Sequence, residues 1–101
     1  MGFKVIITES ARADLSEIVR RIARDDRAAA VRTGYAILAR FQVLENFPQF
    51  GRVIPERNDP VWRELIHRPY RLMYHVNDAQ SVVHAARIWH GARGSLPDLK
   101  V

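Results

Sequence analysis

The 101-residue sequence lacks cysteine, which excludes disulfide bonds and thiol chemistry and is typical of cytoplasmic proteins. It also lacks any apolar run near the roughly 20 residues that a membrane-spanning helix requires. Its first residues do not form the long apolar region and cleavage site of a secretory signal. We therefore expect a cytoplasmic protein with no membrane attachment.

Patterns of metal ligands are missing as well. The four histidines have neither the i,i+4 spacing of a helical metal site nor cysteine companions; they are His67, His75, His84 and His90. We therefore expect no metal and no cofactor.

Lysine is scarce, because only Lys4 and Lys100 stand among the 16 basic residues and the other 14 are arginines. The formal net charge is +5. Residues 1–50 carry 8 basic and 6 acidic residues, which gives +2, and residues 51–101 carry 8 and 5, which gives +3. The charge is therefore spread along the chain and indicates an anionic partner, either nucleic acid or an acidic protein.

The first half of the sequence predicts one strand followed by two helices. Residues 3–8 are apolar and β-branched, as in a short buried strand. Ser10 is a candidate N-cap, and five apolar residues follow it at helical spacing: Ala11, Leu15, Ile18, Val19 and Ile22. A second helix is expected over about residues 27–46, ending before Pro48 because the residue before a proline resists the helical conformation. The short break between the helices predicts an antiparallel hairpin.

The second half predicts an ordered loop over residues 48–60 and then three strands, over about residues 62–67, 70–76 and 81–89. Strict alternation would place Val83, Ala85, Arg87 and Trp89 on one face of the last strand. We expect one α+β domain over residues 1–101, in which the N-terminal strand and helical hairpin pack on a small, mostly antiparallel four-stranded sheet. The other face of the sheet should be partly open, and residues 94–101 should form a loosely attached tail.

Five short motifs follow one another along almost the whole chain. They are Ala11-x-x-Asp14-Leu15-x-x-Ile18, Phe47-Pro48-x-x-Gly51-Arg52-x-x-Pro55-Glu56, Arg63-Glu64-Leu65, Tyr70-Arg71-Leu72-Met73-Tyr74 and His90-Gly91-Ala92-Arg93. With these motifs the sequence resembles the ParE/RelE superfamily of bacterial toxins from type II toxin–antitoxin pairs. The resemblance implies a RelE/ParE-like fold and an antitoxin as partner.

Within this superfamily the resemblance favours the ParE branch. RelE-like toxins cleave messenger RNA on the ribosome with lysines, arginines and a C-terminal tyrosine or histidine. Here Trp62 and Glu64 stand where the lysines would be, Pro97 stands where the tyrosine would be, and only Arg71 matches. ParE toxins poison DNA gyrase and are neutralised by a ParD-like antitoxin. The resemblance thus implies no catalytic residues, and no sequence-specific DNA binding is expected of the toxin alone.

The candidate target-contact residues lie on the predicted strands and just after them: Arg63, Arg71, Arg87, His90 and Arg93. Arg71 must either face solvent or pair with a carboxylate such as Glu64. His90 could instead end the last strand and hydrogen-bond a backbone carbonyl. If the protein is a ribonuclease, Arg71 holds the scissile phosphate and His90 acts as acid or base. A cluster of several unpaired arginines would itself indicate an anionic partner.

The edge of the helical hairpin should leave an apolar seam for an amphipathic antitoxin helix, and the candidate groove residues are Leu15, Val19, Ile22 and Phe41. Free toxin could cover this seam by forming a homodimer. Three hypotheses follow: a gyrase inhibitor that acts by protein contact, a ribosome-dependent endoribonuclease, and an inactive relative that only binds the antitoxin.

Overall fold

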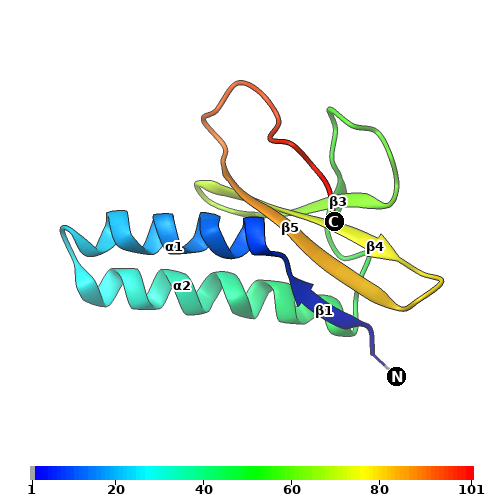
Figure 1. Cartoon of the computed structure of the whole chain (residues 1–101), viewed down its shortest axis with the longest axis horizontal. Helices are drawn as coiled ribbons and strands as arrows, with labels where there is room; N and C mark the ends of the chain where they lie inside the picture. Colours follow the sequence, from blue (N-terminus) through cyan, green and yellow to red (C-terminus); the bar gives the residue numbers. More distant parts are fainter. Residues whose placement is uncertain (1) are drawn as a thin grey trace.

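A computed structural model describes residues 2–101 and contains a helical hairpin packed on one sheet (Figure 1). The elements in chain order are β1 (Lys4–Ile7), α1 (Glu9–Ala23), α2 (Arg27–Gln42), the 3-10 helix η1 (Val43–Glu45), β2 (Arg52–Val53), β3 (Trp62–His67), β4 (Tyr70–Asn77) and β5 (Val82–His90). No helix within residues 2–101 is long and apolar enough to cross a membrane.

The sheet has five strands in the order β1-β5-β4-β3-β2, so the prediction of four strands was wrong by one. The additional strand, β2, lies in the segment predicted as a loop, where Arg52 pairs with Glu64 and Val53 with Arg63. Two residues are too few to show the alternating pattern of a strand. β1 runs parallel to β5, and the other neighbouring strands are antiparallel, so the sheet is mixed.

Both helices begin at side chains that accept a hydrogen bond from the first turn. The hydroxyl of Thr8, and not that of Ser10, accepts from the Ala11 N–H. Asp26 does the same for the Ala29 N–H at the start of α2. Such caps satisfy backbone donors that a helix leaves unpaired. The second helix ends at Gln42, earlier than predicted, and continues as η1.

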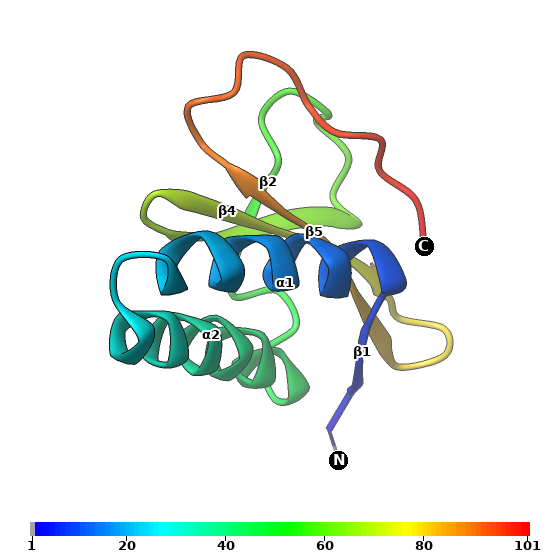
Figure 2. The ribbon, with the colours of Figure 1, turned by 60° about the vertical axis from the view of Figure 1, so that its left-hand side comes forward.

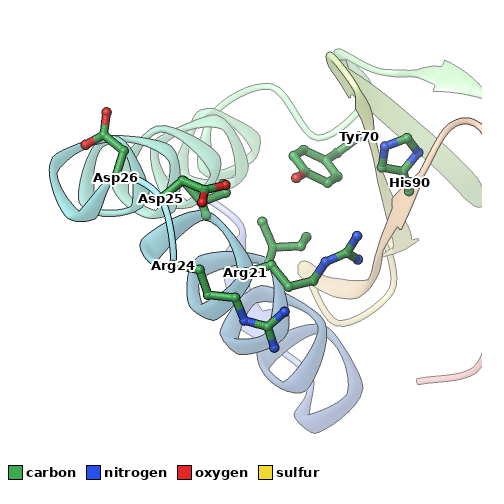
Figure 3. Close-up of a pocket in the computed structure, with 8 residues that line it drawn as sticks. Arg21, Arg24, Asp25, Asp26, Tyr70 and His90 are labelled. Atoms are coloured by element: carbon green, nitrogen blue, oxygen red, sulfur yellow. The ribbon is translucent and has the colours of Figure 1, made fainter.

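The helical hairpin covers one face of the sheet, and the chain before β3 and after β5 lies on the other side (Figure 2). On the helical side, buried residues of α1 and α2 pack against the strands; among them are Ile18, Ile37, Phe41, Leu72 and Tyr74. At the end of this layer, Arg21 of α1 lies near Tyr70 and His90 at the ends of β4 and β5 (Figure 3).

The second face of the sheet is covered by a smaller apolar cluster of Ile54, Trp62, Met73, Ala86 and Leu99, with Trp89 and Leu96 packed against it. The prediction that residues 94–101 form a loosely attached tail is therefore wrong, because Leu99 is buried. The Trp89 Nε1–H also donates to the Ser95 carbonyl at 2.9 Å. The predicted partly open face is closed over this cluster by the tail and the loop after β2.

A bulge changes the alternation of side chains along β5. Tyr74 pairs with Ala85 and Met73 with Arg87, so Ala86 is the additional residue of β5. One extra residue in a strand shifts all later side chains to the opposite face. Val83 and Ala85 accordingly share the helical side with Ile88, and Arg87 does not share their face as strict alternation predicted.

Candidate interaction surface

A buried carboxylate lies at the centre of the polar network on the second face of the sheet. Glu64 of β3 is fully buried, and its carboxylate accepts from Arg52 Nε of β2 at 2.8 Å and from Arg71 Nε of β4 at 2.7 Å. The strand register brings the three residues together, because Arg52 is the pairing partner of Glu64 and Arg71 pairs two residues further along β3. The pairs satisfy a charge that would otherwise be costly to bury.

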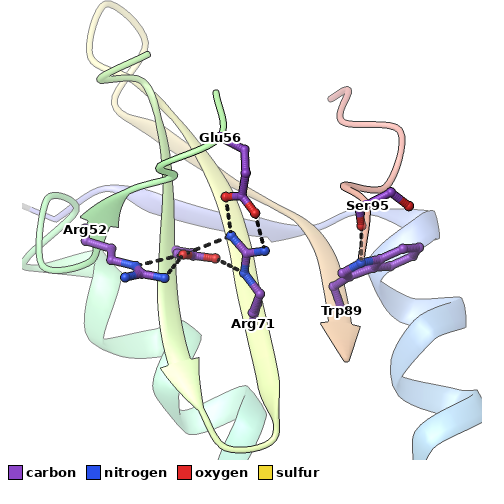
Figure 4. A network of polar contacts seen from close by, with 6 residues as sticks. Arg52, Glu56, Arg71, Trp89 and Ser95 are labelled. Atoms are coloured by element: carbon purple, nitrogen blue, oxygen red, sulfur yellow. Dashed lines mark hydrogen bonds and ion pairs between the residues drawn. The ribbon is translucent and has the colours of Figure 1, made fainter. Parts of the chain in front are cut away.

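Glu56 completes this network from the loop between β2 and β3 (Figure 4). Its carboxylate accepts from Nη1 and Nη2 of Arg71, both at 2.8 Å. These bonds lower the pKa of Glu56 from its ordinary 4.5 to about 2. Hydrogen bonds from Arg71 to Glu56 and then to Glu64 raise the pKa of the Arg71 guanidinium. The donors of Arg71 therefore face two carboxylates of its own chain.

Of the two interpretations that the sequence left open for Arg71, the structure shows the ion pair. The Arg71 side chain is 13% exposed, against 49% for that of Glu56. Arg52 and Arg71 carry two positive charges, and Glu56 and Glu64 carry two negative ones. This part of the predicted cationic surface is therefore neutralised internally, and it does not show the arginine crowding that would indicate an anionic partner.

Arg87 is likewise paired within the fold. Its Nε and Nη2 donate to the carboxylate of Asp14 in α1 at 2.7 and 2.9 Å. The same carboxylate accepts the backbone N–H of Ile88 at 2.9 Å, so α1 covers β5 where β1 no longer pairs with it. Hydrogen bonding to Asp14 raises the pKa of Arg87. Asp14, a motif residue of the first helix, thus joins the helix to the sheet.

The other predicted contact residues lie apart from this network. Arg63 donates to the carbonyls of Pro60 and Gly51, both at 3.0 Å. Arg93 stacks on the Trp89 ring at 4.2 Å. The structure therefore does not bring the predicted residues into one cationic surface, and their contact with a target stays a prediction.

His90 ends β5, as its structural interpretation proposed, but its backbone partner is an N–H and not the expected carbonyl. Its Nδ1 accepts the backbone N–H of Ala92 at 3.1 Å, and its ring lies edge-on to Tyr70 with centroids 5.7 Å apart. One hollow of about 500 Å³ lies between this pair and α1, and another of about 470 Å³ lies toward Arg68 and Arg71. Within residues 2–101, no group of three or more histidines and carboxylates is placed to hold a metal ion.

The predicted antitoxin groove is only partly present. Leu15 and Val19 line an apolar hollow of about 370 Å³ between the helices, whose other residues are Val31, Gly34, Tyr35 and Leu38. Phe41 cannot line a groove because it is fully buried in the core. Ile22 lines the hollow beside Tyr70 and His90 instead.

The residues of α2 that line this hollow were missed as a group. Val31, Tyr35 and Leu38 follow one another at intervals of four and three residues, which is the signal of one helix face. Tyr35 is 72% exposed, so this face is apolar and accessible. We call the six residues lining the hollow the helical groove: Leu15, Val19, Val31, Gly34, Tyr35 and Leu38.

Three comparisons relate the chain to known proteins. A family model described as "ParE toxin of type II toxin-antitoxin system, parDE" matches residues 5–94. A chain of the chromosomal ParDE toxin–antitoxin system from P. aeruginosa superposes with a TM-score of 0.71 at 21% identity, over 87% of this chain and 95% of that one. A chain of the toxin–antitoxin complex RelBE2 from Mycobacterium tuberculosis gives a TM-score of 0.56 at 25% identity, over 89% and 99%. No curated protein matches.

Replacing Arg71 tests whether its role is structural. Arg71→Ala is expected to lower the free energy of unfolding by about 3 kcal/mol, because the buried Glu64 loses one of its partners. Urea denaturation followed by circular dichroism measures the change. Arg32→Ala removes an equal charge from an exposed position of α2 and should change stability by less than about 0.5 kcal/mol. Equal stability of the two variants would contradict a structural role.

The ion pair between Glu56 and Arg71 should make the free energy of unfolding depend on pH in a known direction. Because the folded pKa of about 2 lies below the ordinary 4.5, the stabilisation is present above pH 4.5 and is lost as the pH falls toward 2. The side chain is half exposed, so the effect should be that of a surface pair, up to about 1 kcal/mol. Glu56→Gln should flatten this part of the stability–pH profile, measured by urea denaturation. A variant profile parallel to that of the natural protein would show that the pair adds no stability.

Proposed function

Because this chain belongs to the ParE toxin family of type II toxin–antitoxin systems, we propose that it inhibits DNA gyrase by protein–protein contact and is neutralised by a ParD-like antitoxin. The family implies this target, and the geometry supports contact over catalysis.

The observation that carries the proposal is the state of Arg71. A ribonuclease would need this guanidinium free for a phosphate, but Glu56 and Glu64 occupy its donors. The nuclease branch has a lysine on the strand beside Arg71. At that position of β3 this chain has Glu64. A carboxylate there repels a phosphate where a lysine would attract it. The network therefore favours a toxin that acts without cutting RNA.

Antitoxin binding is assigned to the helical groove. An amphipathic helix recognises such a groove through apolar residues spaced along one face. Gly34 keeps the groove deep, because a Cβ at this position would lie 3.3 Å from Cγ2 of Val19. Arg12 and Arg32 are exposed arginines of the two helices that form the groove, and they would attract an acidic antitoxin. In free toxin, a second copy would cover the same groove.

The second candidate is a RelE-like ribosome-dependent endoribonuclease. The likeness to a chain of the RelBE2 complex, at 25% identity, is the observation that keeps it under consideration. In that case Arg71 would hold the phosphate after Glu56 had left it, and His90 would act as acid or base. A third candidate is an inactive family member that retains only antitoxin binding.

Induced expression in bacteria separates these candidates. We expect growth arrest accompanied by altered plasmid supercoiling or stabilised DNA breaks, seen by gel electrophoresis of plasmid topology. Messenger cuts at fixed codon positions, mapped by primer extension, would contradict gyrase inhibition and support the nuclease. Soluble, folded protein without growth arrest would leave only the antitoxin-binding role.

Tyr35 tests the helical groove as the antitoxin site. The probe is the small acidic ribbon-helix-helix protein expected from the neighbouring gene. Tyr35→Ala should weaken its binding at least about tenfold in calorimetry, because truncation of an aromatic anchor costs about 2 kcal/mol. Phe50→Ala is the matched control, since Phe50 is 63% exposed but lies outside the groove. Equal loss in both variants, or none, would place the antitoxin elsewhere.

A further inference from the structure

A hollow of about 500 Å³ lies between the last turns of α1 and the ends of β4 and β5 (Figure 3). It is separate from the Arg71 network, and most of its lining residues belong to no motif discussed above. Arg21 extends from α1 toward the strand end that carries His90, and Tyr70 lies beside His90. We call Arg21, Tyr70 and His90 the donor pocket.

The hydrogen bond to His90 determines which of its ring nitrogens carries a proton. Nδ1 accepts the N–H of Ala92 at 3.1 Å, so this nitrogen presents a lone pair. A neutral imidazole with an accepting Nδ1 carries its proton on Nε2. Nε2 is therefore a donor, and the edge-on packing with Tyr70 fixes the orientation of the ring.

The other two members of the pocket also offer hydrogens. The Arg21 guanidinium has five N–H donors and no acceptor, and the Tyr70 hydroxyl can donate. Across residues 2–101, neither the Arg21 guanidinium nor the Tyr70 hydroxyl has an ion-pair or hydrogen-bond partner, and none is found for Nε2 of His90. Three donors of three residue types thus line one hollow, and one of them is a full positive charge.

The carboxylates at the rim limit what such a pocket can accept. Asp26 caps α2 and points away from His90, while Asp25 also lines the hollow. Asp14 and Glu17 line an adjoining hollow. A nucleic acid would bring one phosphate charge after another past all these groups, whereas a single carboxylate would bring one charge, opposed mainly by Asp25.

We propose that the donor pocket binds a carboxylate of a protein partner, as an aspartate or glutamate side chain. Arg21 supplies the charge-assisted hydrogen bond, and Tyr70 and His90 Nε2 donate to the same group. The proposal goes beyond gyrase inhibition, because it rests on the geometry of the pocket and holds whichever acidic protein is the target.

Nuclear magnetic resonance of the histidine ring nitrogens tests the pocket directly. The free protein should show His90 as the Nε2–H tautomer. A short glutamate peptide should then shift the His90 ring signals and saturate. Arg21→Gln should weaken this binding about tenfold or more, as loss of a charge-assisted hydrogen bond requires. Asp25→Asn should strengthen it roughly two- to fivefold, because a competing charge is removed.

Arg57→Gln is the matched control, since it removes an equal exposed charge that does not line the hollow. It should change binding by less than about twofold. The proposal is overturned by the opposite tautomer, by an equal loss in the Arg21 and Arg57 variants, or by His90 signals that the peptide leaves unmoved. It is also overturned if an oligonucleotide of equal charge binds the pocket more tightly than the peptide, since nucleic acid would then be the ligand. This binding test uses the purified protein and does not depend on gyrase. A negative plasmid assay would therefore contradict the proposed function and leave the proposal for the donor pocket to be tested separately.

Discussion

The ion pairs of Glu64 are the constraint on which much of the rest depends. A fully buried carboxylate needs partners, and here they come from the strands on either side, Arg52 and Arg71. Glu56 then attaches the loop between β2 and β3 to the outer side of Arg71. One buried charge thus fixes the relation of β2, β3, β4 and a loop, and it holds the donors of Arg71 where they cannot also face a target.

Charges are also paired within the fold where the helices meet the sheet. Asp14 accepts from Arg87 and from the Ile88 backbone, so a carboxylate of the first motif neutralises an arginine of β5. The surplus of positive charge therefore lies on other residues, many of them exposed on the helices and turns, such as Arg21, Arg24 and Arg68. Arg52, Arg71 and Arg87 on the strands maintain the fold, so most of the unpaired positive charge lies on the helices and turns.

The sequence predicted the order of the main elements because helical periodicity and strand alternation are local signals. The helices, three of the later strands and the pairing of Arg71 with Glu64 as one alternative could be inferred in this way. The strand β2 could not, since Arg52 and Val53 form a strand only through their pairing with β3. The faces of β5 depend on the bulge at Ala86, and the burial of Leu99 depends on a contact distant in sequence.

For the site, the types of residue were easier to predict than whether each side chain is free to contact a partner. Arginine and histidine at strand ends indicated a polar surface, but partner carboxylates decide whether a guanidinium is free, and register decides the partners. Phe41 was predicted to line the groove, and only the packing shows that it is fully buried. The grouping of Arg21 and Tyr70 with His90 gave no sequence signal, because the three residues come from separate elements.

Arg71 and Glu64 should be energetically coupled as parts of the fold. A double-mutant cycle with Arg71→Met and Glu64→Gln measures that coupling through the free energies of unfolding of the four proteins. We expect a coupling free energy of about 2 kcal/mol, as contacting members of one polar network show. Additive effects, with coupling near zero, would show that the ion pair does not stabilise the fold and would leave Arg71 available for a target.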